Sequence, residues 1–313
     1  MTSPRPASVD AGEHTQDDGY FGPDSVTWRV AAHPAMGISA GCAGTIQMLY
    51  PQVMHMIDQA SSFRELPDLR AQRTGEFAAT VFFGDRASAD HAGEVLRRIH
   101  HRCVAVDPHT GEEYRADKPE LLEWVFVSLT WSLLRGAEVY GPSLTPEEQD
   151  QFVVEQHTMA RMVGLDPTDQ VCTRAEVDAY MQDALPLLAY GYDTRWFKQV
   201  MIPSTIPTSL GAGVKQLMQW GSVTLYLPEH RELFGIRWNP IRQATTVASV
   251  KLLLAPIAAT PFDQIVPQFR EFVDENAFGA RKRKVDPGPR SDDNADGAPA
   301  SSPSADDRAS TRS

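Results

Sequence analysis

Cysteine is scarce in this sequence of 313 residues, and several familiar metal and nucleotide motifs are missing. The three cysteines, Cys42, Cys103 and Cys172, are scattered and form no C-x-x-C pair, so neither a disulfide framework nor a cysteine zinc site is indicated. None of the nine histidines belongs to an H-x-x-x-H or E-x-x-H pattern, which excludes the usual helical zinc and di-iron signatures. The P-loop and G-x-G-x-x-G motifs are absent too, so the common nucleotide-binding signatures are excluded.

The sequence also lacks a long uninterrupted hydrophobic run. Residues 1–20 contain no apolar segment of the kind that a signal peptide needs, and the most apolar later stretch, residues 244–262, is interrupted by Lys251 and Pro256. We therefore expect no transmembrane segment and a cytoplasmic location. The formal net charge of −12 argues against a nucleic-acid partner, because such a protein needs a basic face. The simplest role of this acidic balance is solubility.

What remains is the composition of a globular protein, with 42% hydrophobic and 22% charged residues. Residues 1–20 are polar, and residues 279–313 carry almost no large apolar side chain, so both ends are predicted to be disordered tails. The basic run at 281–284 is more simply a solvated helix end than a phosphate- or partner-binding patch. No repeat or clear linker interrupts residues 21–278, which predicts one domain.

Helix-start signals recur along this domain, whereas the alternation typical of strands is scarce. Thr145 and Thr173 each precede a glutamate at the spacing of a capping box. Pro119 opens the run 120–134, which is apolar on nearly all sides, and its length favours a buried central helix over a strand. The sequence therefore predicts an all-α fold. Further helices are predicted at 36–60 with a bend at Pro51, 67–82, 86–103, 173–188, 206–224, 240–254 and 260–276.

One polar face stands out on the predicted helix 86–103. Arg97, His100 and His101 lie at i, i+3 and i+4, and therefore share a face. Such a face could hold a carboxylate, a haem propionate or an oxygen intermediate, and a histidine can exchange protons near neutral pH. The simpler alternative is a solvated surface with ion pairs to Glu94. The spacing alone does not decide between the two.

Several short strings occur in a recognisable order between about residues 24 and 275. They are DSVTWRV (24–30), PAM (34–36), Q-x-x-x-P (47–51), SFR (62–64), QRT (72–74), FFG (82–84), R-x-x-H (97–100), TG-x-x-Y-x-AD-x-PELL-x-WV (110–125), GLDP (164–167) and LFG-x-x-W-x-P (233–240). No single string is specific. The ordered set resembles the superfamily of the fungal oxygenase MpaB and the bacterial latex-clearing rubber oxygenases.

This resemblance implies an all-α fold and an oxidoreductase activity. In the rubber oxygenases it implies a b-type haem that uses dioxygen to cleave carbon–carbon double bonds of an apolar, terpenoid-like substrate. The segment with Arg97, His100 and His101 matches the one that supplies basic residues near the haem, so these three are the candidate catalytic residues. Arg73 and Trp124 are candidate cofactor contacts, with the iron between the helices that carry Arg97 and Trp124.

The chain departs from the family at three histidines, where it carries Tyr50, Ala60 and Phe126. Phe126 replaces the histidine that matches the presumed iron ligand, and a phenylalanine cannot ligate iron. Tyr50 could ligate ferric haem, as a tyrosine does in catalase, and His100 or His101 could also be recruited. Two classes of function remain open. The first is a haem-dependent oxygenase acting on a hydrophobic small molecule, and the second is a non-catalytic helical relative that binds such a molecule or a protein partner without haem. Trp124, Trp131 and Phe126 are then simply core aromatics.

Overall fold

The computed structural model describes residues 19–61, 63–202, 206–261, 264, 267–268, 271–273 and 278. The chain divides into a unit of residues 1–280 and a unit of residues 281–313, and every described residue belongs to the first unit. The basic run at 281–284, the predicted tail 279–313 and all but two residues of the tail 1–20 lie outside the described residues. So does most of the predicted helix 260–276.

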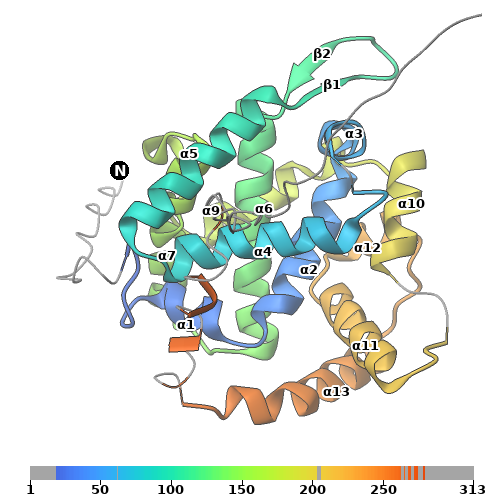
Figure 1. Ribbon diagram of the computed structural model, residues 1–313. Helices are drawn as coiled ribbons and strands as arrows, with labels where there is room; N and C mark the ends of the chain where they lie inside the picture. The colour runs from blue at the N-terminus through green and yellow to red at the C-terminus, as the bar shows by residue number, and fades with distance from the viewer. Residues whose placement is uncertain are drawn as a thin grey trace, which may run out of the picture. The chain divides into compact units, whose positions relative to one another are not determined.

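Helices make up nearly all of the regular structure in the described ranges (Figure 1), which confirms the predicted all-α class. The α-helices are α1 (Val26–Ala32), α2 (Met36–Ile46), α3 (Pro51–Ala60), α4 (Pro67–Phe83), α5 (Arg86–Arg102), α6 (Pro119–Tyr140), α7 (Pro146–Glu155), α8 (His157–Val163), α9 (Arg174–Asp183), α10 (Tyr192–Met201), α11 (Leu210–Thr224), α12 (Pro228–Leu233) and α13 (Pro240–Ala258). Short 3-10 turns are η2 (Gln47–Leu49), η3 (Pro167–Asp169) and η4 (Leu185–Leu187), and the strands are β1 (Val104–Val106) and β2 (Glu113–Arg115).

Helix α6 is the predicted central helix, and it runs beyond the apolar stretch 120–134 in both directions. Pro119 occupies its first turn, where no backbone N–H is needed, and Gly141 ends it with a φ of 99° that suits glycine. Its buried Ser132 donates a hydrogen bond of 2.7 Å to the carbonyl of Ser128, so the hydroxyl is satisfied inside the core. Helix α2 packs along α6, with Ser39 against Gly136. A side chain at Gly136 would therefore collide with α2.

The predicted helix 36–60 is broken rather than bent. Helix α2 ends at Ile46, η2 follows, and Tyr50 adopts an extended conformation with φ −82° and ψ 112° before α3 begins at Pro51. A residue before proline is disfavoured in the helical region, which explains the break. The helix predicted at 173–188 also ends early, at Asp183, and continues as the separate turn η4.

Other boundaries agree closely with the predictions. Helices α4 and α5 end within one residue of the predicted positions, and Asp85 caps α5 by accepting a hydrogen bond of 2.8 Å from the amide of Ser88. Both predicted capping boxes form, at Thr145 and at Thr173. Helix α13 runs four residues past the predicted end.

Four short helices, α1, α8, α10 and α12, and the hairpin of β1 and β2 were not predicted. The strands are antiparallel, and each has three residues, too few to show an alternating pattern. The turn between them is fixed by a side-chain cap and a glycine. The carboxylate of Asp107 accepts from the amides of His109 and Thr110, and Gly111 has a φ of 74°. The hairpin leads the chain directly from α5 to α6 and packs against α3.

Helix α4 crosses in front of α6 in Figure 1, and α5 returns beside α4 towards the hairpin. Helix α8 packs against both α5 and α6. Within the described ranges, no helix combines the length and the apolar character needed to cross a bilayer. The predicted polar face of residues 97–101 thus lies on a helix with packed neighbours on two sides, α4 and α8.

Candidate functional site

Helix α5 presents its predicted site residues to two different environments. His100 is half-buried, and its Nδ1 atom is completely covered without a hydrogen-bond partner. Arg97 and His101 instead open into a hollow on the surface. The structure therefore separates His100 from the two residues that share its face in the sequence pattern.

The imidazole of His100 lies where α4 and α5 meet. Burial and, to a smaller extent, the positive charge of Arg70 on α4 lower its pKa to about 4, against the opposing effect of Asp117. Burial also lowers the pKa of Arg70, but a guanidinium remains charged at neutral pH. At neutral pH the imidazole of His100 is therefore uncharged and has one covered nitrogen without a partner. The guanidinium of Arg70 provides a positive charge nearby.

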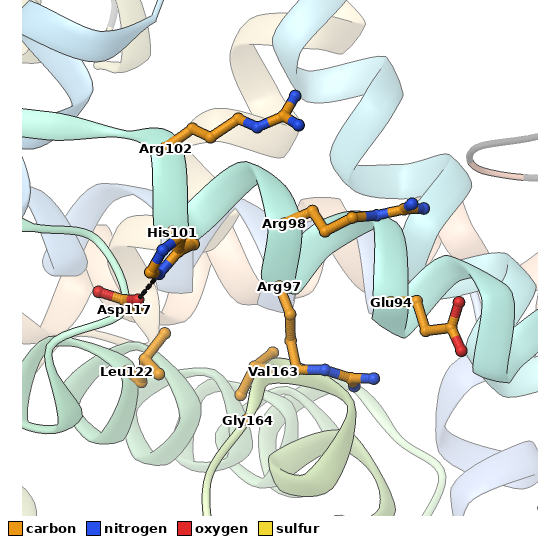
Figure 2. A pocket seen from close by; sticks show the side chains of 9 residues that line it. All are labelled: Glu94, Arg97, Arg98, His101, Arg102, Asp117, Leu122, Val163 and Gly164. Carbon is orange, nitrogen blue, oxygen red and sulfur yellow. Dashed lines mark hydrogen bonds and ion pairs between the residues drawn. The ribbon is translucent and has the colours of Figure 1, made fainter.

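The surface hollow has a volume of ≈ 680 Å³ and lies beside the second half of α5. It is lined by Glu94, Arg97, Arg98, His101, Arg102, Asp117, Leu122, Val163 and Gly164 (Figure 2). Nδ1 of His101 lies 2.8 Å from a carboxylate oxygen of Asp117, whose other oxygen accepts a hydrogen bond of 3.0 Å from Arg115. The predicted solvated face with ion pairs is thus realised at His101, although its partner is Asp117 and not Glu94.

Arg97 is fixed to a neighbouring helix. Its Nη1 donates to the carbonyl of Met162 at 3.1 Å and, more weakly, to that of Arg161 at 3.5 Å. These carbonyls belong to the last turn of α8, and that of Arg161 also accepts a hydrogen bond of 3.2 Å from the amide of Gly164. Part of the guanidinium of Arg97 is therefore used to join α5 to α8.

Trp124 and Phe126 lie in the core of α6 and not at the hollow. Trp124 is 0% exposed and its Nε1 donates to the carbonyl of Gln47 at 3.2 Å, while Phe126 is 3% exposed. Leu122 is the residue of α6 that lines the hollow beside Arg97. The structure does not bring Arg97 together with Trp124 and Phe126, as the predicted position of the iron requires.

The ring of Tyr50 contacts the ring of Trp124, and the two ring centroids lie 5.7 Å apart. Burial, followed by the nearby Glu123 and Tyr50, raises the pKa of Tyr180 on α9. Arg73 is exposed on α4, three residues beyond Arg70. The predicted cofactor contacts Tyr50 and Arg73 are therefore not gathered around His100.

Arg70, whose charge acts on His100, and His55 were not among the predicted site residues. Arg70 lies one helical turn before Arg73, and that spacing could have drawn attention to it. His55 on α3 has an Nδ1 that is covered and unpaired, as in His100, and nothing in its sequence context signals this.

The sequence also contains a G-x-S-x-G pattern, typical of serine hydrolases, at Gly37, Ser39 and Gly41, and it was not among the predicted sites. In these enzymes the serine stands exposed on a sharp turn between a strand and a helix. Here Ser39 is 2% exposed inside α2, and its hydroxyl donates back to the carbonyl of Ala35 at 3.1 Å. The geometry is that of a packed helix residue and not of a nucleophile.

A family model described as "ER-bound oxygenase mpaB/B'/Rubber oxygenase, catalytic domain" matches residues 28–257. The chain belongs to this family. No curated protein and no solved structure matches the chain. The matched range contains α4, α5 and α6 in full, so the place where Arg70 meets His100 lies inside the family's catalytic domain. The predicted family is confirmed.

The metal-ligating side chains of the described residues bear on which cofactor the protein could hold. No three His, Cys, Asp or Glu side chains in these parts of the chain are grouped as ligands of a bare metal ion. A haem needs only an axial ligand from the protein, because the macrocycle supplies the other nitrogens. His100 has an imidazole nitrogen without a hydrogen-bond partner, whereas Phe126, where the resemblance predicts a histidine, has no donor atom.

Proposed function

We propose that the protein is a haem-dependent oxygenase that oxidises or cleaves an apolar, terpenoid-like small molecule with dioxygen. The observation that carries this proposal, within a family of oxygenases, is the covered and unpaired Nδ1 of His100 beside the charge of Arg70. A buried polar atom without a partner is costly, and a bound cofactor is one explanation for its retention. We propose His100 as the haem ligand in place of the histidine that the chain lacks at Phe126.

The residues around His100 would each have a distinct part. Burial and the charge of Arg70 keep the imidazole unprotonated at neutral pH, which leaves a nitrogen lone pair free for the iron. Arg70 would offer its positive charge to a haem propionate or another anionic group at the cofactor. The haem, when bound, would supply the dioxygen chemistry, while the protein provides ligation, polarity and access for the substrate.

A second candidate function is supported by the aromatic packing in α6. Phe126 and Trp124 are almost fully buried, and the Tyr50 ring covers the Trp124 ring. This packing suits a non-catalytic relative that binds a hydrophobic small molecule or a protein partner without haem. The two candidates make opposite predictions for the content of haem.

The test is a comparison of haem content and absorbance in purified variants, expressed with added haem precursor. We expect a Soret band and near-equal amounts of haem and protein in the wild type, and a loss of most of the haem in His100→Ala. His109→Ala changes an exposed histidine in the hairpin turn and serves as the matched control. Circular dichroism would show whether each variant remains folded.

Three outcomes would speak against the proposal in different ways. If the wild type takes up no haem even after reconstitution with hemin, the non-catalytic candidate prevails. If Tyr50→Phe removes the Soret band while His100→Ala keeps it, the ligand assignment is wrong. If His109→Ala loses as much haem as His100→Ala, the effect is not specific to the buried imidazole.

A further inference from the structure

The surface hollow carries positive charge that the rest of the described structure does not neutralise. Three arginines, Arg97, Arg98 and Arg102, line it. The side chains of Arg98 and Arg102 make no hydrogen bond, ion pair or ring contact with any described residue, and that of Arg97 binds only neutral backbone carbonyls. This concentration of positive charge occurs in a chain whose formal net charge is −12.

The two acidic residues of the hollow offset only part of the charge of these arginines. Asp117 is already engaged by His101 at 2.8 Å and by Arg115 at 3.0 Å. Glu94 makes no ion pair with a described residue, so its negative charge remains in the hollow, and the arginines still leave a positive balance. Figure 2 shows the side chains of Arg97 and Arg98 both extending along α5 towards Glu94, with the His101–Asp117 pair at the opposite end of the labelled residues.

Stabilisation of the helix does not account for the whole cluster. Basic residues in the last turn of a helix interact favourably with its dipole, and His100, His101 and Arg102 occupy that turn of α5. Arg97 and Arg98 precede it by a turn, where this effect has faded. The dipole therefore leaves these two charges unexplained.

The local backbone is shaped to hold Arg97 in place. A Cβ atom at Gly93 would lie 2.8 Å from the sulfur of Met162 and 3.2 Å from Nη1 of Arg97. Gly164, with a φ of 102°, passes close to the aliphatic part of Arg97, and a Cβ atom there would lie 3.4 Å from its Cδ. Glycine at these two positions allows α5 and α8 to approach with the arginine between them. Arg97 is thus positioned before any ligand arrives.

We propose that this hollow binds the phosphate group of an organic anion. Guanidinium groups match the geometry of phosphate oxygens and form charge-assisted hydrogen bonds with them. A volume of ≈ 680 Å³ exceeds the needs of a lone phosphate and lies within the range of small-molecule sites, about 300–1,000 Å³. Leu122 and Val163 offer apolar surface to the organic part. This inference goes beyond the proposed oxygenase activity and requires no haem.

The first experiment is a calorimetric titration of the purified full chain with pyrophosphate at constant ionic strength. The double variant Arg98→Gln, Arg102→Gln removes two charges that make no internal contact, so its folding should not change. We expect the Kd for pyrophosphate to rise at least about tenfold in this variant, because each charge-assisted hydrogen bond contributes appreciably to binding. Arg195→Gln removes an exposed arginine on α10 and should leave the Kd unchanged.

A second pair of measurements distinguishes two sources of the phosphate. Titration with glycerol 3-phosphate tests a soluble organic phosphate, and sedimentation with vesicles of phosphatidylcholine and phosphatidic acid tests a lipid headgroup. Binding in either assay that the double variant loses and Arg195→Gln keeps supports the proposal and names the source. The proposal is overturned if pyrophosphate does not bind, if the double variant binds it as the wild type does, or if Arg195→Gln weakens it equally. None of these outcomes depends on whether haem binds.

Discussion

His230, on α12, offers a test of how this core tolerates an unsatisfied polar group. Its side chain is 0% exposed, and neither ring nitrogen has a hydrogen-bond partner. The ring of Trp131 meets it edge to face with centroids 6.0 Å apart, and the ring of Tyr226 does so at 6.4 Å. The perturbation we consider is His230→Phe, which keeps an aromatic ring in this cage and removes both nitrogens.

The expected gain in stability can be worked out from the missing hydrogen bonds. A buried polar group without a partner costs about 1–3 kcal/mol, and aromatic contacts of this geometry are kept by phenylalanine. Because the phenylalanine ring is slightly larger, part of this gain is offset by tighter packing. We therefore expect the free energy of unfolding at neutral pH to rise by about 1 kcal/mol.

The effect should grow at acidic pH. Burial, together with the charge of Arg231, lowers the pKa of His230 from 6.5 to about 4. Between these two values the unfolded chain binds a proton that the folded protein does not, so the wild type loses stability as the pH falls. A pH of 5 lies about 1.5 units below the unfolded pKa of 6.5, so the wild type loses about 2 kcal/mol of stability at this pH. His230→Phe has no group that titrates at this position and does not undergo this loss.

Urea unfolding followed by circular dichroism at pH 7.5 and pH 5 measures both quantities. Fluorescence is a poorer signal here because Trp131 touches the mutated side chain. The loss of stability on acidification should be smaller in His230→Phe than in the wild type, while His109→Ala should behave as the wild type. Equal losses in all three proteins, or a variant that is less stable than the wild type at both pH values, would refute the reasoning.

Two further predictions concern the packing of α2 and the role of Arg70. Gly136→Ala should lower the free energy of unfolding by about 1–3 kcal/mol, because the new methyl group would collide with Ser39. Thermal unfolding measures this loss, and an unchanged Tm would contradict the prediction. Arg70→Gln should reduce the haem content of the purified protein, whereas Arg73→Gln, one turn away and exposed, should not; equal haem content in both variants would separate Arg70 from the cofactor.

The long helices could be predicted because local signals specify them. Pro67 and Asp85 mark the starts of α4 and α5, and Gly84 separates the two helices. Pro51 is a local signal whose effect was underestimated. It was predicted to bend the helix 36–60, but a proline also disfavours the helical conformation of the residue before it, here Tyr50, and so can interrupt the helix. The short helices and the hairpin gave no such warning, because hydrophobic periodicity needs a window of about 11 residues to be recognised.

The candidate site could be predicted only in part, and the reason is geometrical. The spacing of Arg97, His100 and His101 predicts that they share one sector of α5, whereas the structure separates His100 from the other two. Adjacent residues on a helix are separated by about 100° around its axis, so His100 can face α4 while His101 faces solvent. Which direction each takes depends on how α5 is rotated against α4 and α8. That rotation is set by packing between helices and not by the sequence of α5 itself.

The attachment of Arg97 to the end of α8 has a mechanical consequence. It anchors one flank of α5 at the level of Gly164, while the hairpin anchors the end of the same helix through Gln59, whose amide both donates to and accepts from the backbone of Val106. With both points held, α5 cannot slide along its length without breaking these hydrogen bonds. His100 lies between the two anchors in the sequence, so its position against α4 is held from both sides.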